Sequence, residues 1–292
     1  MKCIAWLTDI HLNFISYIDL VTFADKVLKH EPDAVVITGD IGEADTVVGY
    51  LAELEKLLQK DIYFVLGNHD YYKGSIYDVR AKVRVAARHS TRLRWLPDIG
   101  IAELTPTVCL IGHGSWADGR YGDWERSGLL LNDHFYIKEF NPSVRTTGHD
   151  SREFFDPDPA LATAFGSADA KERRLQIMQA LAEEPALHFA KLLPKALASY
   201  DHVIVATHVP PFREASWYAG RISDDIWAPH FSCKAVGDVL RSEMGKHPDK
   251  RMTVLCGHTH GKGEAQILDN LIVHTGDAIY GKPKVQQVFE FA

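Results

Sequence analysis

A run of polar residues, Gly67-Asn68-His69-Asp70, closes an apolar stretch in the first third of the chain. The apolar stretch, Ile62 to Leu66, is typical of a buried strand, whose end has no structural need for an amide, an imidazole and a carboxylate in succession. A metal site does need such groups. Asn68 offers a neutral oxygen to a hard cation, His69 exchanges a proton near neutral pH, and Asp70 can hold a neighbour in place. We therefore take this run as the first candidate for a catalytic metal site.

Four further polar clusters share its position directly after a predicted strand. They are Asp9-x-His11, Gly39-Asp40-x-x-Glu43, Thr207-His208 and Gly257-His258-Thr259-His260. Because the carboxyl ends of parallel strands share one edge of a sheet, where ligands bind, clusters far apart in the chain can converge there. The sequence therefore predicts one composite site at this edge.

The elements that must position these clusters alternate between strands and helices. Apolar runs predict strands at 3–7, 34–38, 62–66, 108–111, 203–206 and 252–256. Helical spacing of apolar residues predicts helices at 17–30, 46–60, 75–89, 170–183, 185–200 and 234–247, with Pro185 opening the fifth. Strands at 264–268, 271–274 and 285–289 follow. The alternation at the start of the chain predicts an α/β fold with parallel strands and right-handed crossovers.

The clusters offer more ligands than one metal ion needs. Together they supply two aspartate oxygens, one asparagine oxygen and four histidine nitrogens. Two ions that share one carboxylate fit this number better than a single ion of four to six ligands. The mixed set of nitrogen and oxygen suits Mn²⁺, Fe or Zn²⁺ better than Mg²⁺ or Ca²⁺, which prefer oxygen alone.

The five clusters resemble the signature of the calcineurin-like metallophosphoesterase superfamily. All five are present, in the family's order, between residues 9 and 260. The resemblance implies a four-layer α-β-β-α sandwich of two mixed sheets, forming a single metallophosphoesterase domain over residues 1–292. It covers the core of the chain but not an irregular stretch near 113–165, which we interpret as an insertion or lid.

The same resemblance implies a role for each residue. Asp9, His11 and His260 would bind the first ion, Asn68, His208 and His258 the second, and Asp40 would bridge both. Two cations about 3.5–4 Å apart lower the pKa of a shared water, so the implied activity is attack of a bridging hydroxide on a phosphate monoester or diester. His69 would protonate the leaving oxygen. Glu43 is the first candidate to orient His69, and Asp70 is the second.

The stretch 113–165 is rich in aromatic residues among Gly, Asp, Asn and Pro. A segment this long and irregular in a compact domain is usually functional. It leaves from the end of the strand at 108–111, where a lid could cover the site. Its arginines are candidates for holding a phosphate oxygen, Arg120 first, followed by Arg126, Arg145 and Arg152. His113 and His274 also follow strands or lie at their ends, and are candidates to line the site.

Two departures from the family pattern narrow the range of possible substrates. Protein Ser/Thr phosphatases of this superfamily follow the bridging aspartate with Asp-Arg-Gly and end the next cluster in Glu, whereas this chain has Glu43-Ala44-Asp45 and Asp70. This difference argues against a protein phosphatase and leaves a small-molecule, nucleotide or lipid-derived phosphate ester. The alternative is a catalytically inactive scaffold or binding protein of the same fold. Such proteins usually lose a ligand or the acid histidine, and this sequence keeps them all.

Composition limits the remaining possibilities. Of 292 residues, 46% are apolar and 24% charged, as in an ordinary globular domain. The net charge of −7 and the lack of a long Lys/Arg run argue against a nucleic-acid partner, and we interpret the basic stretch from Arg80 to Arg94 as the solvated face of a helix. No apolar run reaches the length of a membrane span. Cys3, Cys109, Cys233 and Cys256 are widely scattered, which suggests no disulfide framework and a reducing, cytoplasmic location.

Overall fold

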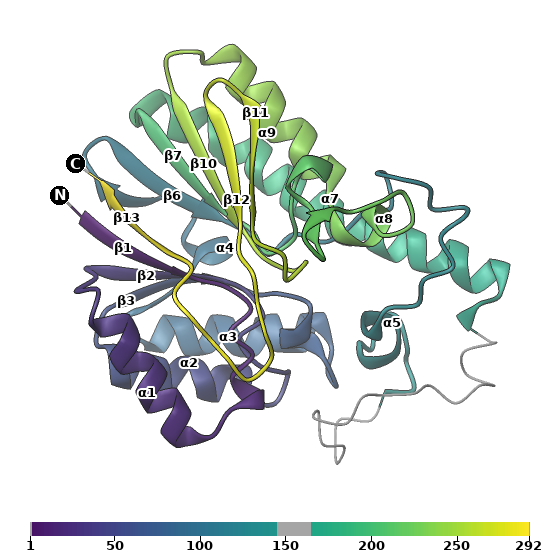
Figure 1. Ribbon diagram of the computed structural model, residues 1–292, viewed down its shortest axis with the longest axis horizontal. Coiled ribbons are helices and arrows are strands. Elements are labelled where there is room, and N and C mark those ends of the chain that lie inside the picture. Colours follow the sequence, from purple (N-terminus) through teal and green to yellow (C-terminus); the bar gives the residue numbers. More distant parts are fainter. Residues whose placement is uncertain (1, 145–164, 292) are drawn as a thin grey trace.

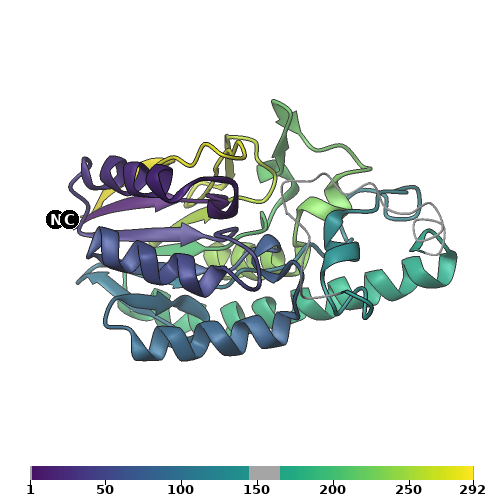
Figure 2. The same ribbon diagram turned by 90° about the horizontal axis from the view of Figure 1, so that it is seen from below.

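The computed structural model describes residues 2–144 and 165–291, whose main strands form two packed sheets. Helices cover the outer face of each sheet, so the layers run helix, sheet, sheet, helix (Figures 1 and 2). The predicted four-layer sandwich of two mixed sheets is therefore confirmed. The described ends of the chain lie side by side, because Lys2 pairs with Phe291 across the first sheet.

The first sheet has the strand order β13-β1-β2-β3-β4, with β1 to β4 parallel and β13 antiparallel to β1. Side-chain caps begin two of its helices, since the hydroxyls of Ser16 and Ser75 accept hydrogen bonds from the backbone N–H of Asp19 and Asp78. The sheet and its helices comprise β1 Lys2–Leu7, α1 Tyr17–Leu28, β2 Ala34–Thr38, α2 Val47–Leu58, β3 Asp61–Val65, α3 Ile76–His89, β4 Leu93–Trp95 and β13 Gln287–Phe291.

The second sheet has the strand order β11-β12-β10-β7-β6-β5. Its four central strands are parallel, and the edge strands β5 and β11 are antiparallel to their neighbours. The sheet and the two helices that cover it comprise β5 Ala102–Thr105, β6 Val108–Gly112, α7 Ala168–Ser199, β7 His202–Ala206, α9 Lys234–Lys246, β10 Arg251–Cys256, β11 Gly263–Leu268 and β12 Leu271–Thr275.

Apolar side chains fill the space between the two sheets. Ile4 and Val36 of the first sheet meet Leu110, Ile204 and Leu255 of the second in one buried cluster. The opposite faces of the same strands pack against the helices. Strands buried on both faces read as continuous apolar runs, which is why the sequence located β1, β2, β3, β6, β7 and β10 within a residue or two.

The prediction of two helices at 170–183 and 185–200 is wrong. A single helix, α7, runs from Ala168 to Ser199 with Pro185 and Pro194 inside it. Proline removes one backbone hydrogen bond and tends to end or kink a helix. Here buried side chains on both sides of Pro185, such as Met178 and Phe189, pack into the same core and outweigh that cost.

The strand predicted at 285–289 is found at 287–291, and it joins the first sheet instead of extending the β-rich second sheet. The chain between β12 and β13 therefore crosses from one sheet to the other (Figure 1). The short strands β4 and β5 were not predicted. Between them a one-turn helix, α4 Leu96–Ile99, inserts the buried Leu96 between the sheets.

Two segments interrupt the alternation of strands and helices. Of the stretch 113–165, the structure describes 113–144 and Phe165, which contain the short helix α5 Asn132–Tyr136. The second segment, 207–233, carries the hairpin β8 Trp217–Tyr218 and β9 Arg221–Ile222 and the turn of helix α8 Ala228–Phe231. Both α5 and α8 lie beyond the carboxyl ends of the strands (Figure 1). The remaining elements are the 3₁₀ turns η1 Leu12–Phe14, η2 His69–Tyr71 and η3 Arg213–Ala215.

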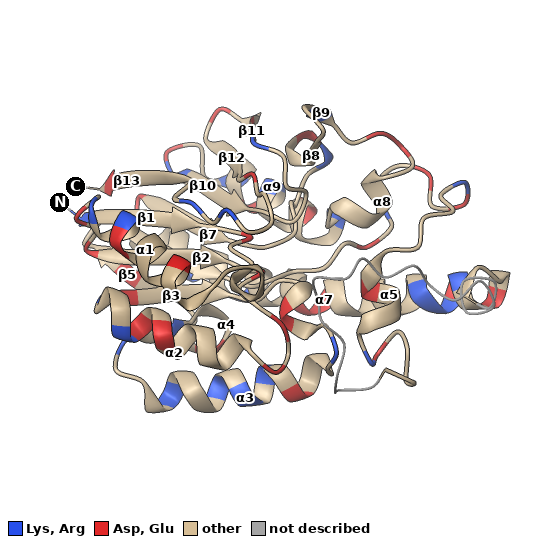
Figure 3. Ribbon diagram, turned by 60° about the horizontal axis from the view of Figure 1, so that its bottom comes forward, with Lys and Arg blue, Asp and Glu red and all other residues tan. Residues whose placement is uncertain are grey.

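The basic stretch from Arg80 to Arg94 falls largely on α3, which lies on the outside of the molecule with Lys and Arg along its length (Figure 3). Arg84 and Arg88 both pair with Asp98. The interpretation of this stretch as the solvated face of a helix is confirmed for Lys82, Arg84 and Arg88, which are exposed, whereas Arg80 is 13% exposed and pairs with Glu184. Within the described ranges 2–144 and 165–291, no helix combines the length and apolar character needed to span a membrane.

Candidate metal centre

The predicted ligands lie in the loops directly after β1, β2, β3, β7 and β10, at the carboxyl edge of both sheets. Five of them adopt left-handed backbone conformations, with φ of 48° at Asp9, 40° at His11, 54° at Asp40, 71° at His258 and 55° at His260. Such conformations cost about 1–3 kcal/mol each and cluster at functional sites.

Glycines make room for this close approach of loops. A Cβ added to Gly67 would lie 2.1 Å from Oδ1 of Asp40, and one added to Gly257 would lie 2.0 Å from Oδ2 of Asp9. Any side chain at these two positions would displace a predicted ligand. The glycines of the Gly-Asn-His-Asp and Gly-His-Thr-His clusters are thus explained by the packing of one ligand loop against another.

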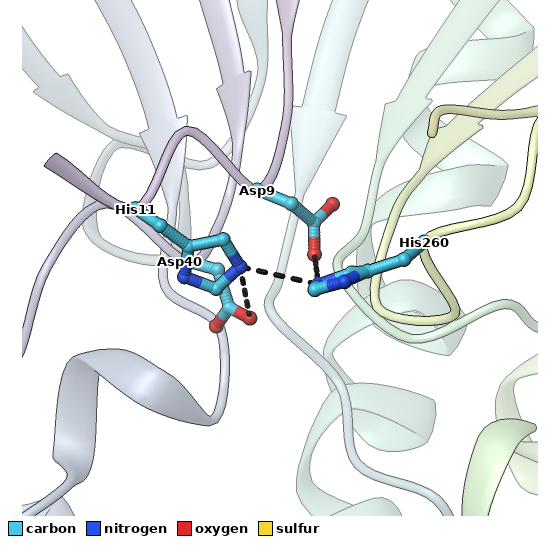
Figure 4. Close-up of side chains that lie close together, drawn as sticks. All are labelled: Asp9, His11, Asp40 and His260. Carbon is cyan, nitrogen blue, oxygen red and sulfur yellow. Dashed lines mark hydrogen bonds and ion pairs between the residues drawn. The ribbon is translucent and has the colours of Figure 1, made fainter. Parts of the chain in front are cut away.

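Asp9, His11, Asp40 and His260 form a first set of ligands, in which one atom from each residue lies within 4.8 Å of the others (Figure 4). Nε2 of His11 is 3.1 Å from Nε2 of His260 and 3.8 Å from Oδ2 of Asp40. Nε2 of His260 is 3.4 Å from Oδ1 of Asp9. Burial lowers the pKa of His11 to about 3, so this ring is neutral near pH 7 and can bind a cation. Two carboxylates and two imidazoles suit a divalent transition metal.

Asn68, His208 and His258 form a second set. Oδ1 of Asn68 lies 2.9 Å from Nε2 of His208 and 3.0 Å from Nδ1 of His258. The other nitrogen of each ring faces a backbone carbonyl, since Nδ1 of His208 is 2.9 Å from Thr38 O and Nε2 of His258 is 3.1 Å from His230 O. Those carbonyls only accept, so the outer nitrogens carry the protons and donate them.

This assignment of protons tests whether the second set fits a metal ion. Burial lowers the pKa of His208, and it lowers the pKa of His258 to about 4, so both rings are neutral near pH 7. The inner ring nitrogens and Oδ1 of Asn68 then present three lone pairs to one another with no proton among them. A cation between them resolves this repulsion, so the residues fit a metal ion.

Asp40 lies between the two sets and faces each with a different oxygen. Oδ2 is 3.8 Å from Nε2 of His11, and Oδ1 is 3.5 Å from Nε2 of His208. Burial, together with the nearby carboxylates of Asp9 and Asp70, raises the pKa of Asp40 well above its usual range. Cations on either side would stabilise the ionised carboxylate. This position suits a carboxylate that bridges two ions.

His69 lies beside both sets. Its backbone N–H donates to Oδ1 of Asp40 at 2.9 Å, and its ring centroid is 4.6 Å from that of His11. The ring also stacks on that of Tyr72, with the centroids 4.2 Å apart. Burial, followed by the neighbouring His11, lowers the pKa of His69 well below its usual value. A phosphate dianion beside the ring would act in the opposite direction, as an acid that donates to the leaving oxygen requires.

Glu43 and Asp70, the two candidates to orient His69, have different surroundings. Oε2 of Glu43 forms an ion pair with Nζ of Lys73 at 2.9 Å. Asp70 is fully buried, and its two oxygens accept hydrogen bonds from the backbone N–H groups of Asp40, Ile41, Gly42 and Gly67. Asp70 thus ties the loop after β2 to the loop after β3. The role predicted for Glu43 stays a prediction.

Sequence reasoning missed three residues at the centre. Oδ1 of Asp133, on α5, accepts a hydrogen bond of 2.8 Å from Nδ2 of Asn68 and one of 2.7 Å from the hydroxyl of Tyr72. The ring of Tyr280, in the crossing between β12 and β13, lies 4.6 Å from that of His11. Of the three, only Tyr72 could have been suspected from the sequence, because it follows the Gly-Asn-His-Asp cluster closely. Asp133 and Tyr280 lie in irregular segments whose positions the sequence does not reveal.

Of the other residues predicted to line the site or to hold a phosphate oxygen, those that the structure describes lie beside acidic side chains. Nε2 of His113 is 3.7 Å from Glu184, and Nδ1 of His274 is 3.2 Å from Glu264. Arg120, the first arginine candidate, pairs with Asp118 and Glu183. Arg126 is largely exposed and lies 3.9 Å from Asp123. Arg145 and Arg152 fall outside the described residues.

Comparison with known proteins finds a matching family model and similar solved structures. The family model described as calcineurin-like phosphoesterase matches residues 4–262. A dimetal phosphatase from Danio rerio has a similar structure, with a TM-score of 0.56 and 13% identity over 97% of this chain and 89% of that chain. The phosphopantetheinyl hydrolase PptH from Mycobacterium tuberculosis follows, with a TM-score of 0.55 and 12% identity over 95% and 89%. At these identities the two structures establish the fold. Among curated proteins, none matches the sequence significantly.

Proposed function

The chain belongs to the calcineurin-like phosphoesterase family, a family of metal-dependent phosphatases and phosphodiesterases, and from this premise we propose its reaction and its metal centre. It hydrolyses a phosphate monoester or diester of a small molecule, a nucleotide or a lipid-derived compound. Two divalent ions, when bound, would help to hold the phosphate. The observation that carries the proposal is the position of Asp40, whose two oxygens face two separate sets of ligands.

The residues divide between the ions as the family pattern implies. Asp9, His11 and His260 would hold the first ion, Asn68, His208 and His258 the second, and Asp40 both. The mixed oxygen and nitrogen ligands favour Mn²⁺, Fe or Zn²⁺. We further propose a reducing, cytoplasmic location, which the four free cysteines support.

When bound, two such ions lower the pKa of a shared water and neutralise charge on the phosphoryl oxygens, so that hydrolysis proceeds near neutral pH. The chain's own part is to hold and protonate. Asp40 fixes the distance between the two sets, and its hydrogen bond from the backbone N–H of His69 fixes the loop that carries the acid. The His69 ring, held between His11 and Tyr72, then protonates the leaving oxygen.

Aromatic side chains at the rim support an organic substrate. Tyr280, 43% exposed, lies over the first set, 5.2 Å from the ring of His260. At the second set, Phe231 meets the ring of His258 edge-on at 5.6 Å, and the 38% exposed Tyr218 packs on Phe231 at 5.3 Å. Rings beside a phosphate site can bind the apolar or planar part of a nucleotide or another small ester.

The test combines metal analysis with two generic substrates. Purified protein supplied with Mn²⁺ is expected to hold two ions per chain and to hydrolyse p-nitrophenyl phosphate, bis(p-nitrophenyl) phosphate or both. The ratio of the two rates decides between monoester and diester. Fewer than two ions per chain would contradict the dinuclear centre. Two bound ions without hydrolysis of these or of natural nucleotide and lipid-derived esters would favour the inactive scaffold.

A further inference from the structure

Asp133 is a buried carboxylate next to the second set of ligands. It lies on α5 and is 6% exposed. Its Oδ1 accepts hydrogen bonds from the amide Nδ2 of Asn68 at 2.8 Å and from the hydroxyl of Tyr72 at 2.7 Å. The opposite end of the same amide, Oδ1 of Asn68, faces His208 and His258. The amide of Asn68 is thus held between this carboxylate and the ligand nitrogens.

The orientation of this amide decides whether Asn68 can bind a cation at all. An ionised carboxylate only accepts hydrogen bonds, so it holds the NH₂ end of Asn68 toward Asp133 and leaves the oxygen facing the ligand set. With the amide turned over, its oxygen would face the carboxylate and its NH₂ group would face the ion. We propose that Asp133 is a positioning residue that directs the oxygen of Asn68 to the second metal ion, an inference that rests on the proposed function.

The charge of Asp133 adds to this role. The first set contains two carboxylates, Asp9 and Asp40, but the second set shares only that of Asp40 and otherwise consists of neutral side chains. From the described residues the carboxylate of Asp133 receives two hydrogen bonds, both from neutral donors. It would therefore place a negative charge one hydrogen bond beyond a ligand of the second ion, where such outer partners strengthen metal binding.

Backbone hydrogen bonds fix the position of Asp133 relative to Asn68. The N–H of Lys73 donates to Tyr136 O at 2.8 Å, and the N–H of Lys138 donates to Gly74 O at 3.0 Å. Close by, the carboxylate of Glu139 accepts from the hydroxyl of Ser75 at 2.7 Å and from the N–H of Ile76 at 3.0 Å. The segment around α5 is thus fastened to the chain that follows Asn68, as a positioning role requires.

Binding of Mn²⁺ alone tests the inference without turnover. Titration calorimetry counts and ranks the two ions, and electron paramagnetic resonance distinguishes an isolated Mn²⁺ from a coupled pair. In Asp133→Ala, the first Mn²⁺ is expected to bind as in the wild type and the second about 10–100-fold more weakly. The signal of the coupled pair should then require correspondingly more Mn²⁺.

Glu139→Gln is the matched control, because Glu139 fastens the same segment but makes its hydrogen bonds away from the ligands. It is expected to lower the melting temperature and leave both Mn²⁺ affinities unchanged. A charge swap supplies the rescue. Asn68→Asp alone places two carboxylates 2.8 Å apart, whereas in Asn68→Asp combined with Asp133→Asn the amide at position 133 donates to the carboxylate at position 68, so the second ion is expected to be recovered.

The outcomes separate this inference from the proposed function. A wild type that binds fewer than two Mn²⁺ ions contradicts the proposed function, and this inference with it. If the wild type binds two ions, the proposed function stands and only the inference is at stake. Three results would then contradict the inference: Asp133→Ala keeps the second ion, Asp133→Ala loses both ions, or Glu139→Gln weakens binding of the second ion equally. Should Asp133→Ala fail to fold, Asp133→Leu, which fills a similar volume but accepts no hydrogen bond, must weaken binding of the second ion for the inference to stand.

Discussion

The two ligand sets differ in what holds them in place. The first set comes entirely from the loops after β1, β2 and β10, at the edge of the sandwich. The second set also depends on the two segments that interrupt the alternation, since Asp133 of α5 holds Asn68 and the carbonyl of His230 on α8 holds His258. The fold alone thus builds the first half of the centre. The second half is completed by inserted segments, so changes in those segments should act on one ion before the other.

The largest effect is expected where the two halves join. Asp40→Asn replaces the shared carboxylate by an amide, which cannot offset two dications, so both ions should be lost or weakened. Activity should fall on every ester. The fall should exceed about 10³-fold, which is the cost of losing a single electrostatic stabiliser. Elemental analysis of the purified variant measures the metal. Two tightly bound ions with normal turnover would show that the halves do not share this residue.

A smaller effect is expected for a residue that belongs to neither half. His69→Ala should keep both ions and lose about 10²–10⁴-fold in rate on alkyl esters, the range for general acid catalysis. The loss should shrink for nitrophenyl esters, because nitrophenolate leaves without a proton. Rates on an alkyl and a nitrophenyl ester, compared at equal metal content, measure it. Equal losses on the two esters would instead make His69 an electrostatic group.

Asp70 ties the loop of the bridging Asp40 to the loop of Asn68, so its loss should affect both halves through stability. Asp70→Asn keeps one acceptor oxygen for four backbone donors and should cost about 2–4 kcal/mol of unfolding free energy. Denaturant unfolding of the metal-free protein measures this cost. If stability is unchanged and the variant instead behaves like His69→Ala, Asp70 orients the acid, as the sequence allowed.

The parts of the centre that could be predicted are those fixed by strand ends. A buried parallel strand is recognisable from its apolar run, and a polar cluster after it must lie at the carboxyl edge. That logic places Asp9, Asp40 and Asn68 in the loops where the structure has them. It needed no knowledge of side-chain packing.

The parts that could not be predicted depend on tertiary contacts. Asp133 follows no strand, and its neighbours Leu131 and Asn132 show no pattern that separates it from any other aspartate of a loop. Local propensity predicts a helix start at Pro185, whereas the packing of α7 on the second sheet keeps this proline inside one continuous helix. The crossing that carries Tyr280 depends on β13 pairing with β1, a contact between the two ends of the chain.

The smallest effect is expected at the rim of the second half. The ring of Tyr218 packs on Phe231, whose ring meets His258, and it belongs to neither ligand set, so Tyr218→Ser should leave both ions and kcat nearly unchanged. If its exposed ring binds the organic part of the substrate, KM should rise by about 2–10-fold, the value of one aromatic contact. The rise should appear for an aryl or nucleotide ester and be absent for a small alkyl ester. Tyr218→Phe keeps the ring and should behave as the wild type. A rise in KM of equal size for all esters, or in Tyr218→Phe as well, would mean that the hairpin β8–β9 shapes the second half of the centre rather than selecting the substrate.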